Sequence, residues 1–121
     1  MAKKAAQVMG IILVIIGILG FIPGVTTDSL LFGTFSVNTL WNIMYIVLGL
    51  IGVYVSSSAP ASSKMYLQVV GVIYALWAIL GFVYGSDMIL GIIANNSADN
   101  WLHVVIALIL LYGGFMGSDT A

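Results

Sequence analysis

The sequence of 121 residues has no cysteine, one histidine and only seven charged side chains. The absence of cysteine excludes disulfides, thiolate metal sites, iron–sulfur clusters and dithiol redox chemistry. Three lysines against four aspartates give a net charge of -1, which offers no basic surface for neutralising nucleic-acid phosphates. A zinc or catalytic metal site needs three or four ligands, and one histidine cannot supply them. We therefore expect no nucleic-acid partner, no metal and no cofactor.

Apolar residues are in excess and make up 62% of the chain, well above the share in soluble domains. Four apolar stretches approach the length of about 20 residues that crosses a bilayer. They are residues 5–22, 37–55, 65–84 and 99–116. The sequence predicts an all-α membrane protein, a bundle of four transmembrane helices that forms a single domain over residues 1–121.

The lysines indicate the orientation in the membrane. Lys3, Lys4 and Lys64 precede the first and third stretches, whereas aspartates occupy the other two connections. The positive-inside rule then predicts that both termini lie in the cytoplasm. The outward connections, residues 28–37 and 87–96, are too apolar to be freely solvated. We expect each to form a short interfacial helix or a turn over the mouth of the bundle.

An internal repeat relates residues 3–57 to residues 64–117. At an offset of 61, Lys3, Gln7 and Gly10 match Lys64, Gln68 and Gly71, and at an offset of 58, Asn38 and Asn42 match Asn96 and Asn100. Each repeat is one helical hairpin. Because two crossings return the chain to its starting side, the two hairpins are predicted to be parallel and not inverted.

Small residues recur every seven positions in the first helix of each repeat. They are Gly10, Gly17 and Gly24 in the first, and Gly71, Ala78 and Gly85 in the second. Small residues let helices approach closely in lipid. We expect these residues to be the packing face on which the first and third helices meet, with Gln7 and Gln68 hydrogen-bonded to each other across it.

The single histidine, His103, lies near the start of the fourth helix. Its repeat partner is Tyr45, and each follows an asparagine by three residues, a spacing that places both side chains on one helix face. Helix caps are expected at Asn38 for the second helix and at Ser97 or Asp99 for the fourth. Two interpretations remain open for this group of Trp41, Asn42, Tyr45, Asn100 and His103: a binding site in the outer leaflet, or interfacial rings and interhelical hydrogen bonds.

Four segments carry a family resemblance: "GFIPGVTT", "FSVNTLWNIMYIVLGLIG", "VVGVIYALWAILGF" and "NNSADNWLHVVIALIL". They resemble a family of small prokaryotic four-helix membrane proteins classed only as a domain of unknown function. The family motif Ala-Asp-Asn-Trp-Leu-His is complete in residues 98–103. A second motif, with two histidines at the start of the second helix, has Trp41 and Tyr45 in their places. The resemblance implies a four-helix fold and no activity.

We expect a structural or assembly role for this protein, with self-association into a homo-oligomer or partner binding through helix faces in contact with membrane lipids. The alternative is a binder of a lipid, a quinone or a haem-like ligand that uses the group around His103. No catalytic residue is predicted, because a general base needs a partner within reach and no carboxylate is expected beside His103. The protein is therefore not expected to be an enzyme.

Overall fold

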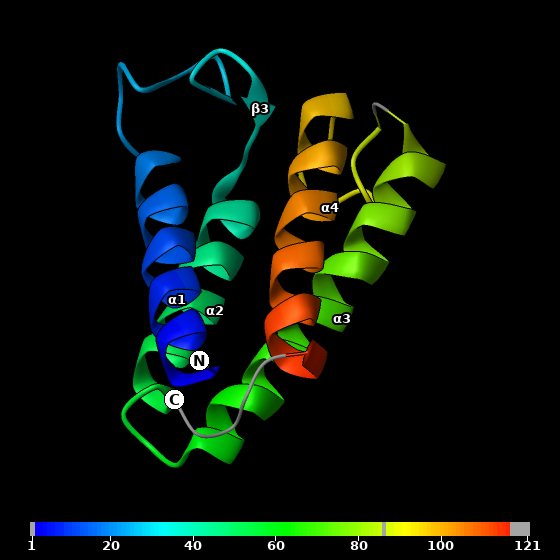
Figure 1. Cartoon of the computed structure of the whole chain (residues 1–121). Helices are drawn as coiled ribbons and strands as arrows, with labels where there is room; N and C mark the ends of the chain where they lie inside the picture. The colour runs from blue at the N-terminus through cyan, green and yellow to red at the C-terminus, as the bar shows by residue number, and fades with distance from the viewer. Residues whose placement is uncertain (1, 86, 117–121) are drawn as a thin grey trace.

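The computed structural model describes residues 2–85 and 87–116, and within them the chain forms four α-helices (Figure 1). The helices are α1 (Ala2–Leu19), α2 (Thr39–Val55), α3 (Pro60–Tyr84) and α4 (Ser97–Leu111). A π-helical turn, η1 (Tyr112–Met116), continues α4. The prediction of a mainly helical protein is confirmed.

Three helical segments are long and apolar enough to cross a membrane. They are Ala2–Leu19, Pro60–Tyr84 and Ser97–Met116, whereas α2 is apolar but has only 17 residues. All four helices expose large apolar side chains, for example Ile15, Leu50, Leu76 and Leu108. Exposed apolar surface on this scale is unusual for a soluble monomer and fits contact with lipid.

Two helix ends differ from the predicted stretches for reasons that hydropathy does not report. α1 ends at Leu19, where the Thr26 hydroxyl donates a hydrogen bond of 2.8 Å to the Leu19 carbonyl. α3 begins at Pro60, because the missing proline amide costs nothing at the first helical position. The polar residues 62–64 therefore lie within the first turns of α3.

The connection between α1 and α2 forms a small antiparallel sheet and not a helix. Its strands are β1 (Thr26–Thr27), β2 (Leu30–Leu31) and β3 (Phe35–Ser36), in the order β1-β2-β3. Asp28 and Ser29, both with positive φ, make the two-residue turn that hairpins favour. Leu31 of this connection and Ile89 of the second one are almost fully buried, so both connections pack against the body of the protein.

The prediction that α1 and α3 meet along the glycines is wrong. α1 packs mainly on α2, and α3 packs mainly on α4 (Figure 1). A Cβ at Gly10 would lie 2.6 Å from the carbonyl oxygen of Gly49, and one at Gly17 would lie 2.7 Å from that of Asn42. Both neighbours belong to α2. A period of small residues marks where a helix is approached closely, but it does not name the partner helix.

The other small residues of the predicted packing face do not join α1 to α3 either. A Cβ at Gly71 would lie 2.8 Å from the side chain of Leu111 in α4, and Ala78 lines a groove that Val104 and Ala107 of α4 also line. Gly24 and Gly85 do not pack against a helix, since a Cβ there would meet nothing within 4 Å. Both have positive φ, so they serve chain reversal.

Candidate functional site

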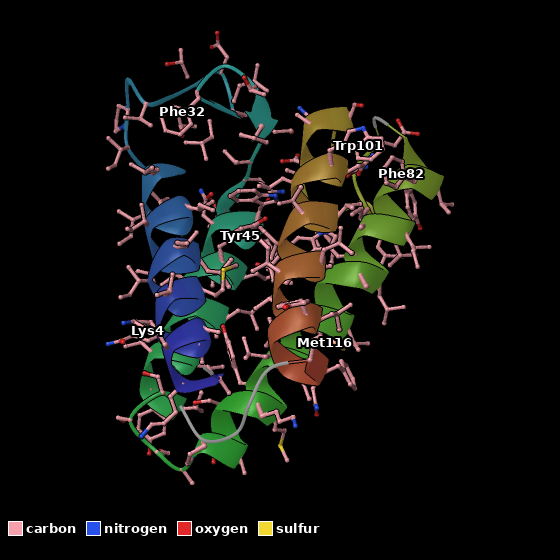
Figure 2. All side chains as sticks on the ribbon, viewed as in Figure 1. Lys4, Phe32, Tyr45, Phe82, Trp101 and Met116 are labelled. Atoms are coloured by element: carbon pink, nitrogen blue, oxygen red, sulfur yellow. The ribbon has the colours of Figure 1, made fainter. Side chains whose placement is uncertain are left out.

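A buried cluster of five rings lies where α2, α3 and α4 meet. Its members are Trp41 and Tyr45 of α2, Tyr74 and Trp77 of α3, and His103 of α4. No member is more than 5% exposed. Figure 2 shows Tyr45 in the space between α2 and α4. We call these five residues the ring cluster.

The rings contact one another closely. Trp41 stacks on Tyr45 with centroids 4.0 Å apart, and Trp77 stacks on His103 with centroids 4.5 Å apart. Tyr45 and Tyr74 lie 6.0 and 5.7 Å from the His103 ring. Each aromatic pair adds about 0.5–1.5 kcal/mol beyond the area it buries. The ring cluster therefore joins α2 to the α3–α4 pair.

Helical spacing positions these side chains. Trp41 and Tyr45 are four residues apart, and Tyr74 and Trp77 are three apart, so each pair lies on one helix face. Asp99 precedes His103 by four residues on α4 and is fully buried with it. The expectation that no carboxylate shares a helix face with His103 is wrong, because Asp99 lies one turn before it on α4. The Asp99 carboxylate itself faces the backbone amides of Asn96 and Ser36.

Polar atoms without hydrogen-bond partners concentrate at this place. Among the described residues, eleven buried side-chain atoms make no hydrogen bond, and eight of them belong to the ring cluster and Asp99. The eight are Trp41 Nε1, Tyr45 Oη, Tyr74 Oη, Trp77 Nε1, both Asp99 carboxylate oxygens and both His103 nitrogens. Buried polar atoms are nearly always paired, so this concentration is the most distinctive chemical feature of the fold.

Two of the five predicted site residues lie outside the ring cluster. Asn42 and Asn100 are buried, and each places its side-chain oxygen where a Cβ would stand on a glycine. The two glycines are Gly20, directly after α1, and Gly81 of α3. Glycine permits this approach because it has no side chain. Trp41, Tyr45 and His103 are brought together, whereas the two asparagines fill the contacts within each helix pair.

Asparagines also cap α2 and α4 and link the α1–α2 connection to the α3–α4 connection by hydrogen bonds. Asn38 accepts a hydrogen bond of 2.9 Å from the Trp41 amide, as predicted. Asn96, and not Ser97 or Asp99, does the same for the Asp99 amide. Each side chain also donates across to the other connection, Asn38 to the Ile92 carbonyl and Asn96 to the Thr34 carbonyl, both at 2.9 Å.

Three residues of this site escaped sequence reasoning: Tyr74, Trp77 and Asp99. The three-residue spacing of Tyr74 and Trp77 and the four-residue spacing of Asp99 and His103 were both visible in the chain. Spacing shows that two side chains share a face, but not that the face is buried. The position of Asp99 in the first turn of α4 suggests a cap, and this position does not report that the side chain is buried.

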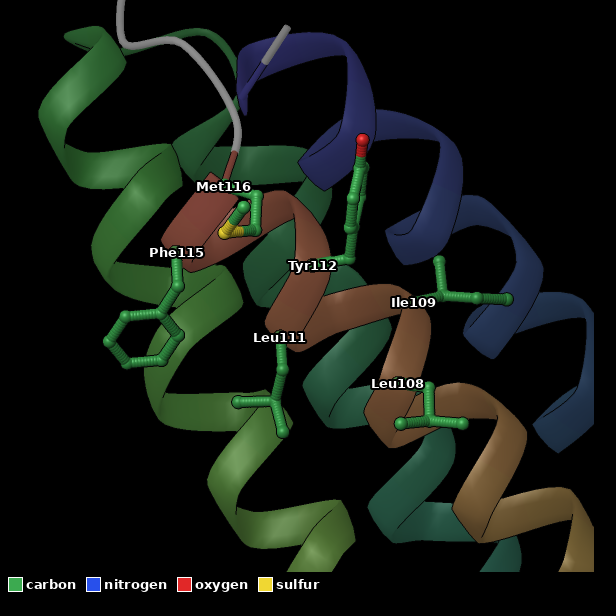
Figure 3. A pocket seen from close by; sticks show the side chains of 6 residues that line it. All are labelled: Leu108, Ile109, Leu111, Tyr112, Phe115 and Met116. Atoms are coloured by element: carbon green, nitrogen blue, oxygen red, sulfur yellow. The ribbon is translucent and has the colours of Figure 1, made fainter.

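Two apolar grooves on the surface of the described residues are lined by no member of the ring cluster. One, of about 590 Å³, runs between α2 and α3 and is lined by residues that include Ile51, Met65 and Val69. Another, of about 700 Å³, is formed by side chains of the last turns of α4 and of η1 (Figure 3). Within residues 2–85 and 87–116, no three His, Cys, Asp or Glu side chains are grouped to hold a metal ion.

Comparison with known families identifies the chain. Residues 3–116 match the family model described as a domain of unknown function, DUF4383, and the protein belongs to this family. The expected resemblance to a family of unknown function is confirmed. Neither the curated proteins nor the solved structures yield a match to the chain.

Proposed function

We propose that this DUF4383 protein is a four-span membrane protein, made of two parallel helical hairpins, with a structural or assembly role. Three segments already have the length and hydropathy to span a membrane. α2 runs antiparallel to α1 from the α1–α2 connection to the 56–59 turn (Figure 1), and this course supports a fourth crossing. The three lysines favour cytoplasmic termini in a prokaryotic cell.

Matched contacts support the duplication of residues 3–57 and 64–117. The contact between Gly20 and Asn42 has its counterpart in Gly81 and Asn100. The hydrogen bond from Asn38 to Ile92 has its counterpart in the bond from Asn96 to Thr34. The two donors are 58 residues apart in the sequence, and so are the two acceptors. Unrelated hairpins have no reason to repeat such polar contacts.

The apolar groove between α2 and α3 carries the proposal of self-association. Met65 and Val69 on its rim are 64% and 52% exposed, and the lining side chains are almost all apolar. Helices associate in lipid by close packing, because acyl chains are as apolar as helix surfaces and no hydrophobic effect drives the helices together. A ridge of a second copy seated in this groove gains packing that flat helix faces do not offer.

Engineered cysteines test this interface cleanly, because the chain has none of its own. Met65→Cys on the groove is expected to form disulfide-linked dimers in native membranes. Val83→Cys is the matched control, because Val83 lies on the same helix, is 75% exposed and is not on the groove. Equal cross-linking of the two variants, or none in either, would contradict self-association through this groove. Lipids retained in its place would indicate an acyl-chain site.

A second candidate function is binding of a small ligand at the ring cluster. The unpartnered polar atoms around His103 favour it, because hydrogen-bonding groups in a dry site are what a quinone, a haem-like ligand or a lipid headgroup would use. Protein purified from native membranes is then expected to carry a ligand, detected by mass spectrometry or by visible absorption. Its loss in His103→Ala and its retention in Trp101→Phe, a change at an exposed ring, support the candidate; a ligand-free native protein refutes it.

A further inference from the structure

Asp99 and His103, called the pair below, are an acid and a base that are enclosed one turn apart on the same helix. Both side chains are fully buried, and they lie one turn apart on the same face of α4. Neither carboxylate oxygen and neither imidazole nitrogen makes a hydrogen bond. The backbone amides of Asn96 and Ser36 face the Asp99 carboxylate.

Among residues 2–85 and 87–116, no lysine lies at the end of the molecule that holds this pair. Lys3, Lys4 and Lys64 lie in the first turns of α1 and α3, at the end of the molecule opposite to the start of α4 (Figures 1 and 2). The titratable groups that face the pair from the other helices are two phenols, Tyr45 of α2 and Tyr74 of α3. A phenol donates a hydrogen bond but brings no positive charge.

We propose that Asp99 and His103 together bind one proton, so that the pair is a neutral proton-binding site within the ring cluster. An ionised carboxylate beside a neutral imidazole would leave one uncompensated charge in a dry interior, which is strongly unfavourable. One added proton removes that net charge whether it sits on the carboxylate or on the imidazole. The partial charges of the α4 amides favour the carboxylate anion, but they are weaker than a full counter-charge.

The bound proton makes the free energy of unfolding depend on pH, and the direction of this dependence follows from the proton count. In the unfolded chain the groups have ordinary pKa values of about 3.9 for the carboxyl and about 6.5 for the imidazole. Between these values the unfolded pair also holds one proton, so stability is expected to be independent of pH. Above about 6.5 the unfolded pair holds none while the folded pair keeps one. Stability then falls, and the unfolding constant rises about tenfold per pH unit.

Unfolding measured from pH 5 to pH 9 in lipid nanodiscs or mild detergent tests the proposal. Asp99→Asn is expected to remove the alkaline slope, since the folded state then has no charge to neutralise. Asp87→Asn is the control and is expected to keep the slope, because Asp87 is exposed in the outer connection. Absence of a slope in the natural protein, or its persistence in Asp99→Asn, overturns the proposal.

A measurement on the natural sequence covers the case in which Asp99→Asn does not fold. His103 is the only histidine, so ¹⁵N-histidine labelling gives one imidazole signal, and infrared absorption reports a protonated carboxyl. At pH 7 we expect either a protonated carboxyl with a neutral imidazole or a carboxylate with an imidazolium. A carboxylate with a neutral imidazole, or two protons on the pair, would refute the site. The result is independent of the proposed self-association.

Discussion

In the first half of the molecule, Gly20 at the end of α1 contacts the side chain of Asn42 from α2; in the second half, Gly81 of α3 contacts Asn100 from α4. The halves thus share the contacts that hold a helix pair together. They differ in chemistry. Three residues after its asparagine, the first half has Tyr45 and the second has His103, with a buried Asp99 one turn before the histidine. Both halves have the glycine and asparagine contact, and only the second half places a carboxyl and an imidazole in the interior.

The largest expected effect distinguishes the interior from the lipid-facing surface of this second half. Trp77→Ala removes a ring that stacks on His103 and that is 5% exposed. The cavity and lost packing should lower the free energy of unfolding by about 3–5 kcal/mol. Trp101→Ala, at a ring that is 60% exposed, should change it by less than about 1 kcal/mol. Unfolding in mixed detergent micelles measures both, and equal losses would contradict the ring cluster as a structural centre.

A smaller effect compares equivalent glycines of the two halves. A Cβ at Gly10 would lie 2.6 and 2.8 Å from backbone atoms of α2, whereas one at Gly71 would meet the flexible side chain of Leu111 at 2.8 Å. Backbone cannot give way as a side chain can, so Gly10→Ala should cost about 1–3 kcal/mol and Gly71→Ala clearly less. The same unfolding assay decides between them. A larger loss of unfolding free energy for Gly71→Ala would contradict the closer backbone approach at Gly10.

The smallest effect concerns the two matched glutamines. Gln68 donates a hydrogen bond of 2.8 Å to the Gly114 carbonyl of η1, whereas Gln7 is exposed. The prediction that they bond to each other is therefore wrong, because the exposed face of α1 turns Gln7 away. Gln68→Leu should lose about 0.5–1.5 kcal/mol, and Gln7→Leu about none. The midpoint of thermal unfolding in nanodiscs measures both changes. Equal midpoints for the two variants would show that the Gln68 hydrogen bond does not stabilise the fold.

Sequence reasoning predicted the helices well and the site only in part. The apolar stretches predicted every α-helix of the described residues, since length and hydropathy are local properties of the chain. Asn38 was predicted as a cap because a cap also depends on the nearest turn alone. Of the five candidate site residues, the structure brings Trp41, Tyr45 and His103 together in the ring cluster. Asn42 and Asn100 lie at the contacts within the two helix pairs, because spacing alone does not show which neighbour a helix face meets.

The chain by itself determined the apolar helices, the asparagine caps and the scarcity of charge, because each depends on residue type and on neighbours within a few positions. The tertiary structure alone decided that Gly10 and Gly17 face α2, that Tyr74 and Trp77 surround His103, and that Asp99 is enclosed with it. These outcomes depend on which helix faces which, a choice made by packing among segments far apart in sequence. Periodicity defines a face of a helix but not its neighbour.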